Sequence, residues 1–152
     1  MKTSAGILLY RFVSGKIEFM LVHPGGPFWK NKDEGSWTIP KGEVEENEEL
    51  MQAAKREFEE ETGFNCDGKL LELSPRKQKS GKWVYAWALE KDIDIEKIKS
   101  NSFQLEWPPK SGKMTEFPEI DKAAWFSANE AKKKINAALI GLIDEVMELV
   151  KK

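Results

Sequence analysis

Three glutamates in one short segment are spaced so that their carboxylates can meet. Glu57, Glu60 and Glu61 stand at positions i, i+3 and i+4, which share one face of a helix because each residue advances by about 100°. Carboxylates this close repel one another unless a cation offsets their charge. Oxygen ligands select hard ions, so the spacing predicts Mg²⁺, or alternatively Mn²⁺, bound together with substrate phosphates. The alternative interpretation is an ordinary solvated helix face.

The helix that must position these side chains is predicted over residues 48–62. Leu50, Ala54 and Phe58 recur every four residues and give an apolar face. Asn47 is the expected N-cap, and Gly63 is suited to the left-handed residue that ends a helix. The acidic residues occupy the other sides of this helix.

The rest of the chain predicts a mixed α/β fold in a single domain, residues 1–152. Ser14-Gly15 predicts a hairpin turn, and Ser127 with Glu130 forms a capping box that opens a helix. The remaining expected elements are strands 5–13, 17–23, 37–39, 70–73, 83–89 and 120–126, a surface loop over 24–36, and a C-terminal helix over 135–150.

Composition excludes several classes of protein. The chain has 152 residues, of which 40% are hydrophobic and 33% charged, as expected for one folded domain. Its longest apolar run is too short to cross a membrane or to form a signal peptide, which predicts a cytoplasmic protein without membrane contact. The single Cys66 and the single His23 exclude an internal disulfide and a Cys/His zinc site. The net charge of −2 conceals nine glutamates against two basic residues between positions 42 and 64.

The glutamates belong to a longer pattern, G-x5-E-x7-R-E-U-x-E-E-x-G-U, where U is a bulky apolar residue. Its fixed positions are Gly42, Glu48, Arg56, Glu57, Phe58, Glu60, Glu61, Gly63 and Phe64. This pattern resembles a complete Nudix box, and the chain is identified on it as a member of the Nudix hydrolase family. The resemblance implies a Nudix-type α/β/α sandwich with a mixed central sheet.

The resemblance also assigns roles to residues. Glu57, Glu60 and Glu61 would be metal ligands, joined by the carbonyl of Gly42 or Lys41. Glu119, in a segment similar to the family's late strand, is the expected fourth carboxylate, with a surface glutamate as the alternative. Glu57 and Glu60 are catalytic candidates, and the identity of the general base stays open. Arg56, with Glu48 as its expected partner, would support the carboxylates.

Substrate contacts are predicted outside the glutamate cluster. Pro40-Lys41-Gly42 resembles the version found in Nudix hydrolases of dinucleoside polyphosphates, so Lys41 is expected at an extra phosphate, or else in a solvated turn. Tyr85 is a candidate for stacking on a base, with core packing as the alternative. Lys79 is a candidate for steering the polyphosphate, with a solvated hairpin as the alternative. The other residues considered for these two roles are Phe28, Trp29, Trp83 and Trp87, and Lys77 and Lys82.

Together these features predict a Mg²⁺-dependent pyrophosphohydrolase that cleaves a phosphoanhydride in a nucleoside diphosphate derivative. A dinucleoside polyphosphate such as diadenosine tetraphosphate is the first substrate considered, and capped RNA stays open as a further class. The alternative is a Nudix domain that binds nucleotide or RNA as a sensor without turnover. Both a monomer and a homodimer are compatible with the sequence.

Overall fold

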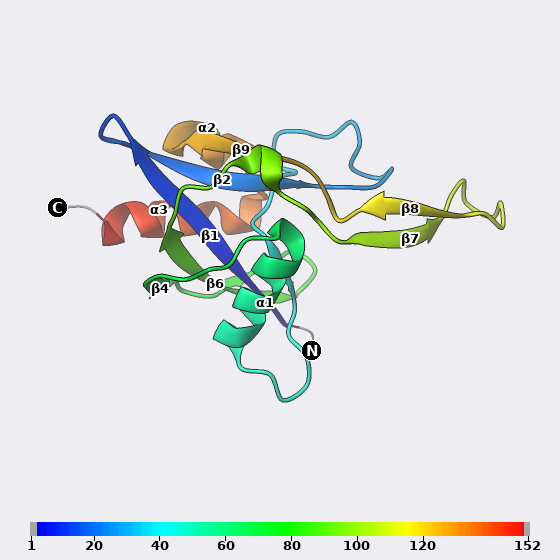
Figure 1. Ribbon diagram of the computed structural model, residues 1–152, viewed down its shortest axis with the longest axis horizontal. Helices are drawn as coiled ribbons and strands as arrows, with labels where there is room; N and C mark the ends of the chain where they lie inside the picture. Colours follow the sequence, from blue (N-terminus) through cyan, green and yellow to red (C-terminus); the bar gives the residue numbers. More distant parts are fainter. Residues whose placement is uncertain (1–2, 151–152) are drawn as a thin grey trace.

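The computed structural model describes residues 3–150, and its centre is a mixed β-sheet (Figure 1). The main path of the sheet runs β4-β6-β1-β2-β9, while β3 pairs with β1 and β5 pairs with β6. β1 and β6 are parallel, and the other pairs are antiparallel. The strands of this sheet are β1 (Thr3–Val13), β2 (Lys16–Pro24), β3 (Lys41–Glu43), β4 (Leu70–Glu72), β5 (Arg76–Lys77), β6 (Trp83–Glu90) and β9 (Ile120–Ser127).

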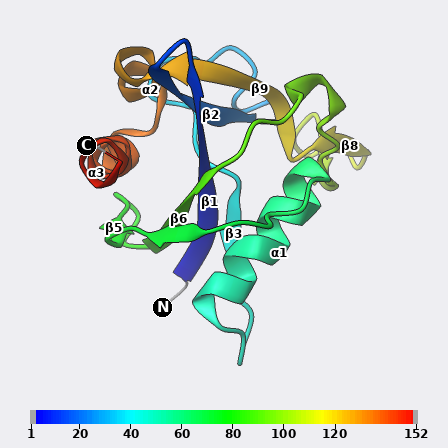
Figure 2. The same cartoon turned by 60° about the vertical axis from the view of Figure 1, so that its left-hand side comes forward.

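Helices cover both faces of the sheet, as Figure 2 shows. Helix α1 (Leu50–Thr62) lies on one face, and α2 (Ala128–Lys134) and α3 (Ile140–Leu149) lie on the other. Side chains alternate across β1, so Ile7 packs in the core under α1 while Leu8 packs in the core under α3. The predicted α/β/α sandwich with a mixed central sheet is therefore confirmed.

The N-terminal hairpin and the end of α1 match the sequence prediction. Ser14 and Gly15 have φ values of 52° and 80°, as a tight hairpin turn between β1 and β2 requires. Gly63 has φ 79°, and its N–H donates to the Glu59 carbonyl. A residue with a Cβ would be strained in this left-handed position, which explains why α1 ends there.

The predicted start of α1 was wrong. The helix begins at Leu50 rather than at residue 48, and its N-cap is Glu49, which makes no side-chain capping bond. Asn47 instead lies in a left-handed turn with φ 66°. The carboxylate of Glu48 is engaged with Arg56 and with the backbone N–H of Glu45, so this stretch forms a loop held against the helix.

Two further elements differ from the prediction. The predicted strand 37–39 is replaced by two isolated bridges, from Thr38 to Val22 and from Trp37 to Ile135. The strand in this part of the chain is β3, which begins at Lys41. The expected helix 135–150 is interrupted because Ile135 is extended and pairs with Trp37. After it come a 3-10 turn, η2 (Ala137–Leu139), and then α3. The capping box is confirmed, since Ser127 Oγ accepts from the Glu130 N–H at 3.2 Å.

A second, two-stranded sheet projects from the body and was not predicted (Figure 1). It consists of β7 (Ser102–Glu106) and β8 (Met114–Pro118), which pair antiparallel. A short 3-10 turn, η1 (Ile95–Lys97), precedes it. We call this projection the β7–β8 arm. Its two ends return to the main body at Asn101 and Glu119, where the Glu119 N–H donates to the Asn101 carbonyl at 2.8 Å.

Candidate metal and phosphate site

The predicted metal ligands lie around one pocket between α1, β3 and the base of the β7–β8 arm. The pocket has a volume of about 300 Å³. We call it the acidic pocket, and its lining residues are Lys41, Gly42, Glu43, Glu57, Glu60, Glu61, Asn101 and Glu119. All five predicted metal-binding positions are in this set, together with Lys41. Residues up to 78 positions apart in the sequence thus meet where α1 packs on β1 and β3 beside the base of the β7–β8 arm.

At Gly42, strand β3 passes close to the Glu57 side chain of α1. Gly42 pairs with Ala5 in the centre of the β1–β3 ladder. A Cβ built at position 42 would collide with the carboxylate of Glu57. The absence of a side chain at this position therefore leaves the space that the Glu57 carboxylate occupies.

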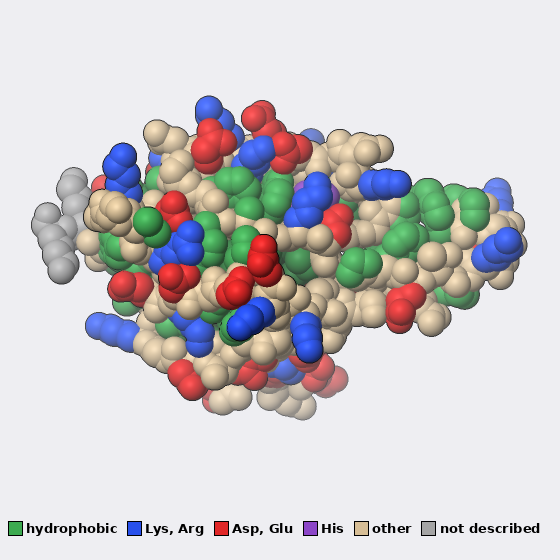
Figure 3. Space-filling view, turned by 45° about the horizontal axis from the view of Figure 1, so that its top comes forward, with side chains coloured by type: hydrophobic (Ala, Val, Ile, Leu, Met, Phe, Trp, Pro, Cys, Tyr) green, Lys and Arg blue, Asp and Glu red, His purple; other side chains and the backbone are tan. Residues whose placement is uncertain are grey.

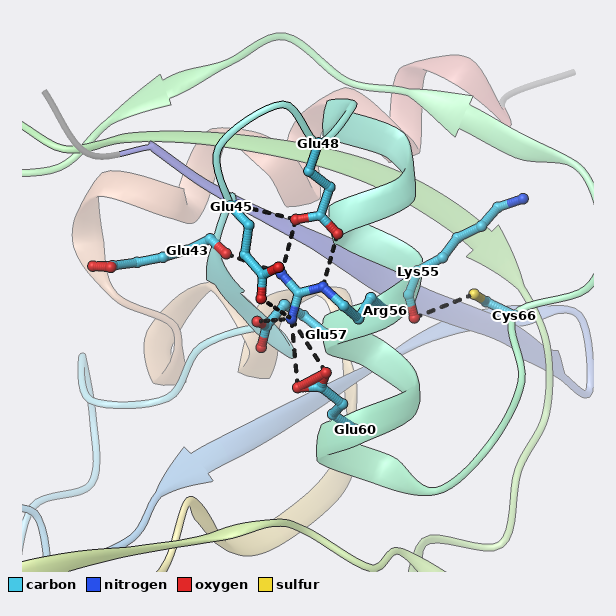
Figure 4. Close-up of polar contacts among 8 residues, drawn as sticks. All are labelled: Glu43, Glu45, Glu48, Lys55, Arg56, Glu57, Glu60 and Cys66. Carbon is cyan, nitrogen blue, oxygen red and sulfur yellow. Dashed lines mark hydrogen bonds and ion pairs between the residues drawn. The ribbon is translucent and has the colours of Figure 1, made fainter.

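Arg56 ties the loop before α1 to two of the pocket glutamates (Figure 4). Its Nε and Nη2 donate to the two oxygens of Glu48 at 2.7 and 2.9 Å, a bidentate pair. Its Nη1 donates to Glu57 at 2.8 Å and to Glu60 at 3.2 Å. Nη2 also donates to the carbonyl of Glu43 at 3.1 Å. Glu48 is thus a hydrogen-bond partner of Arg56, and the supporting role of Arg56 stays a prediction.

The Glu48–Arg56 pair should stabilise the fold at neutral pH. Hydrogen bonds from Arg56 lower the pKa of Glu48 to about 2, and the Glu48 side chain is only 17% exposed. We expect Glu48→Gln to lower the free energy of unfolding by about 1–3 kcal/mol, because the guanidinium loses its charged partner. Thermal denaturation near pH 7 measures this difference. The exposed Glu46→Gln is the matched control and should melt like the wild type.

The same pair has a defined pH dependence. Since the folded pKa of Glu48 is lower than its unfolded value of 4.5, its contribution is complete above pH 4.5 and disappears as the pH falls toward 2. The gap in melting temperature between the wild type and Glu48→Gln should therefore close under acid. A gap that stayed constant down to the lowest pH at which the protein folds would contradict this assignment.

The interior of the acidic pocket is short of positive charge. Burial, and after it the nearby charges of Glu57 and Glu119, raise the pKa of Glu61 to about 8, against the lowering effect of Lys41. Burial also raises the pKa of Glu57, although Arg56 acts in the opposite direction. Carboxyl groups in such surroundings favour the protonated form unless a cation joins them. The electrostatics of the pocket therefore favour cation binding.

The donor set fits a hard divalent cation in charge and in chemistry. Every side-chain donor is a carboxylate or amide oxygen, which Mg²⁺ and Mn²⁺ prefer. Within residues 3–150, no three acidic, His or Cys side chains are already arranged as a metal-ligand cluster. Glu57 and Glu60 direct oxygens toward Arg56 instead. Side-chain rotation around a backbone that is already in place would bring these oxygens to a cation.

The three predicted substrate contacts differ in position. Lys41 lines the acidic pocket, where its charge and its backbone lower the pKa of Glu61 against the other influences. Burial, followed by the charge of Lys82, lowers the pKa of the Lys41 ammonium. Tyr85 packs partly buried against the core under α1, outside the pocket lining. Lys79 is exposed on the turn between β5 and β6. On the same turn, the charge of Lys82 rather than of Lys79 lowers the pKa of Lys41.

Sequence reasoning missed two pocket residues, Glu43 and Asn101. Glu43 follows Gly42 directly within the motif and could have been included on that ground. Asn101 carries no local signal, because only the pairing of β7 with β8 brings it beside Glu119. Among the described residues, no helix is long and apolar enough to cross a membrane.

Comparison with known proteins shows which family the chain resembles. The NUDIX domain family model matches residues 2–146. The asymmetrical bis(5'-nucleosyl)-tetraphosphatase of Caenorhabditis elegans is 43% identical over 61 residues, which are 40% of this chain and 40% of that protein. The match thus spans less than half of that relative.

Solved structures share the fold over almost the whole chain. A crystal structure of a C. elegans Ap4A hydrolase binary complex has a TM-score of 0.68 and 24% identity, and the match covers 99% of this chain and 98% of that one. The NUDIX domain of Shewanella oneidensis NrtR, cocrystallised with ADP ribose, has a TM-score of 0.66 and 14% identity, covering 98% and 88%. At these identities the structures show the common fold alone. Because the family model covers nearly all of the sequence and the fold agrees with it, the chain belongs to the Nudix hydrolase family.

Proposed function

We propose that this protein is a hydrolase, dependent on a divalent cation, that cleaves a phosphoanhydride in a nucleoside diphosphate derivative. Dinucleoside polyphosphates such as diadenosine tetraphosphate are the proposed substrate class. The observation that carries the proposal is the acidic pocket, in which Glu57, Glu60, Glu61 and Glu119 surround the backbone of Gly42. The partial match to a bis(5'-nucleosyl)-tetraphosphatase supports the choice of substrate.

Each residue of the pocket would have a distinct task. Glu57, Glu61, Glu119 and the Gly42 carbonyl would hold Mg²⁺ or Mn²⁺, with Glu60 joining them or remaining free. When bound, the cation supplies charge neutralisation for phosphate oxygens and acidifies a coordinated water. Arg56 would hold the preceding loop against α1 through Glu48 while Glu57 and Glu60 turn from Arg56 toward the cation. Lys41 and Lys82 would add positive charge for the remaining phosphates.

The proton of the attacking water needs an acceptor close to the phosphate. Glu57 and Glu60 are the candidates, and their side chains are 15% and 41% exposed. Glu60 is therefore better able to pass a proton to bulk solvent, while Glu57 is better shielded for holding a cation. The proposed assignment is Glu60 as the base and Glu57 as a ligand.

The test is a product screen with Mg²⁺ or Mn²⁺. Substrates would be dinucleoside polyphosphates, nucleotide sugars, capped RNA and damaged nucleoside triphosphates, with Glu60→Gln beside the wild type. We expect cleavage of diadenosine tetraphosphate, a loss of roughly 100-fold or more in Glu60→Gln, and no turnover in chelator. Tight binding of a nucleotide without turnover of any compound would favour the sensor alternative instead.

A further inference from the structure

The β7–β8 arm has one apolar face, and the loop between β2 and β3 lies on it. On this face Phe103 and Phe117 are directly paired across the strands, with ring centroids 6.0 Å apart. Partly buried residues on this face alternate with exposed ones along both strands. Gly26 of the loop approaches the ring of Phe103 so closely that a Cβ there would lie 3.0 Å from it.

The loop and the arm together present aromatic surface to solvent. Phe28 on the loop meets the edge of Trp107 on the arm, with centroids 5.7 Å apart and an interplanar angle of 78°. Phe28 nevertheless remains 62% exposed. Figure 3 shows the hydrophobic side chains that gather along the projecting arm. We call Phe28 and Trp107 the aromatic pair.

The loop that carries Phe28 is anchored at several points. His23 is fully buried, and its ring nitrogens lie 2.7 Å from the Asp121 carboxylate and 2.7 Å from the Lys32 carbonyl. Because a carbonyl can only accept, Nε2 donates to Lys32 and fixes the far side of the loop. The Gly25 N–H donates to the Glu119 carbonyl at 2.9 Å on the near side. A ligand would therefore meet Phe28 largely in place, at a low cost in ordering.

The arm starts at the acidic pocket and leads away from it. Asn101 and Glu119, which line the pocket, are the two residues at its base. A strand rises about 3.4 Å per residue, so the six residues from Asn101 to Trp107 span roughly 20 Å. A base attached to the phosphate over the carboxylates cannot extend so far, whereas a second nucleoside at the end of a polyphosphate chain can.

Charge on the loop also fits a polyphosphate. Lys30 is exposed, and the ammonium of Lys32 lies 5.2 Å from the centroid of the Trp29 ring. These two cations stand on the same loop as Phe28, after Gly25, and the Lys32 carbonyl is held by His23. Lysine ammonium groups attract phosphate oxygens as point charges, and aromatic faces accept any base by stacking.

We propose that the aromatic pair binds the second nucleobase of a dinucleoside polyphosphate whose anhydride lies over the acidic pocket. This inference rests on the proposed hydrolase function and adds specificity-determining residues to it. Phe28 stacks on the distal base, Trp107, whose ring stands at 78° to that of Phe28, meets the base edge-on, and Lys30 and Lys32 face the chain of phosphates. Neither aromatic residue touches the reacting atoms, so their loss affects KM rather than kcat.

The test compares two substrates that differ only in the second nucleoside, diadenosine tetraphosphate and adenosine tetraphosphate. For Phe28→Ala we expect KM for diadenosine tetraphosphate to rise roughly 10-fold, with kcat and the KM for adenosine tetraphosphate unchanged. Trp107→Ala should do the same. Because Phe28 is mostly exposed, Phe28→Ala should keep the fold. It therefore tests the inference even if Trp107→Ala disturbs the arm.

Phe12→Ala provides the matched control. Phe12 is 47% exposed and meets the edge of Tyr10 at 6.1 Å, much as Phe28 meets Trp107, but it lies on the β1–β2 hairpin. Its kinetics should equal those of the wild type. Equal KM changes for both substrates in Phe28→Ala would overturn the inference, as would unchanged KM with a dimer converted to monomer in gel filtration. Absence of turnover in the wild type would refute the proposed function itself.

Discussion

The Glu61→Gln variant is expected to lose turnover by at least about 100-fold, because a partly buried carboxylate of the proposed cation site can no longer carry negative charge. Substitution of a residue that only orients a metal ligand typically lowers metal affinity or activity 10- to 100-fold. Substitution of a direct ligand should lower activity more. Gln keeps the size of the side chain, which limits the change to charge and donor strength. Steady-state kinetics at saturating Mg²⁺ measures the loss.

Without a cation the same substitution should stabilise the protein. The folded pKa of Glu61, about 8, is higher than its ordinary value of 4.5. An acid whose pKa is raised in the folded protein contributes its full stabilisation below the unfolded pKa. This stabilisation is lost as the pH rises toward the folded pKa. In chelator, the wild type should therefore lose stability relative to Glu61→Gln between pH 4.5 and 8, on the order of 3 kcal/mol.

With Mg²⁺ present, the wild type should instead become more stable than Glu61→Gln. A cation that binds only the folded protein raises its melting temperature, and the effect requires the charged carboxylate. Melting at pH 8 should show a rise with Mg²⁺ for the wild type and little rise for Glu61→Gln. If both proteins respond equally to Mg²⁺, then Glu61 does not belong to the cation site.

The parts of the fold that could be predicted are those with local causes. The four-residue spacing of Leu50, Ala54 and Phe58 predicts α1, and Gly63 predicts its end, because both signals act within one helix. The same spacing places Glu57 and Glu61 on one side of α1. The pocket glutamates on α1 were therefore found without knowledge of the fold, whereas Glu43 on β3 was not.

The parts that were missed depend on distant partners. Asn47 is a residue type that commonly caps helices, but the next residue, Glu48, binds Arg56 and holds this loop against α1, so capping preference does not decide the helix start. The β7–β8 arm depends on pairing across a long turn. The alternation of Phe103, Leu105 and Trp107 is a strand signal that could have revealed it. Asn101 reaches the pocket only through that pairing.

The Gly42→Ala variant is expected to keep its fold and lose most of its activity. The new Cβ would collide with the Glu57 carboxylate, which lies at the end of a flexible side chain. The backbone at this position does not require glycine, so the cheapest response is for Glu57 to swing out of its place. Its hydrogen bond to Arg56 at 2.8 Å would be lost, and so would its approach to a cation. Turnover should fall roughly 100-fold, since a displaced catalytic group costs about that much, while melting temperature changes little.

A double-mutant cycle distinguishes this cause from a general disturbance of β3. In a Glu57→Ala background there is no carboxylate to displace, so adding Gly42→Ala should have little further effect on turnover. The two substitutions would then be strongly non-additive, as expected for residues that act through one contact. Losses that multiply in the double variant would show that Gly42 matters for another reason, such as its own carbonyl. The expected non-additivity would instead establish that glycine is required at position 42 because the Glu57 carboxylate needs the space.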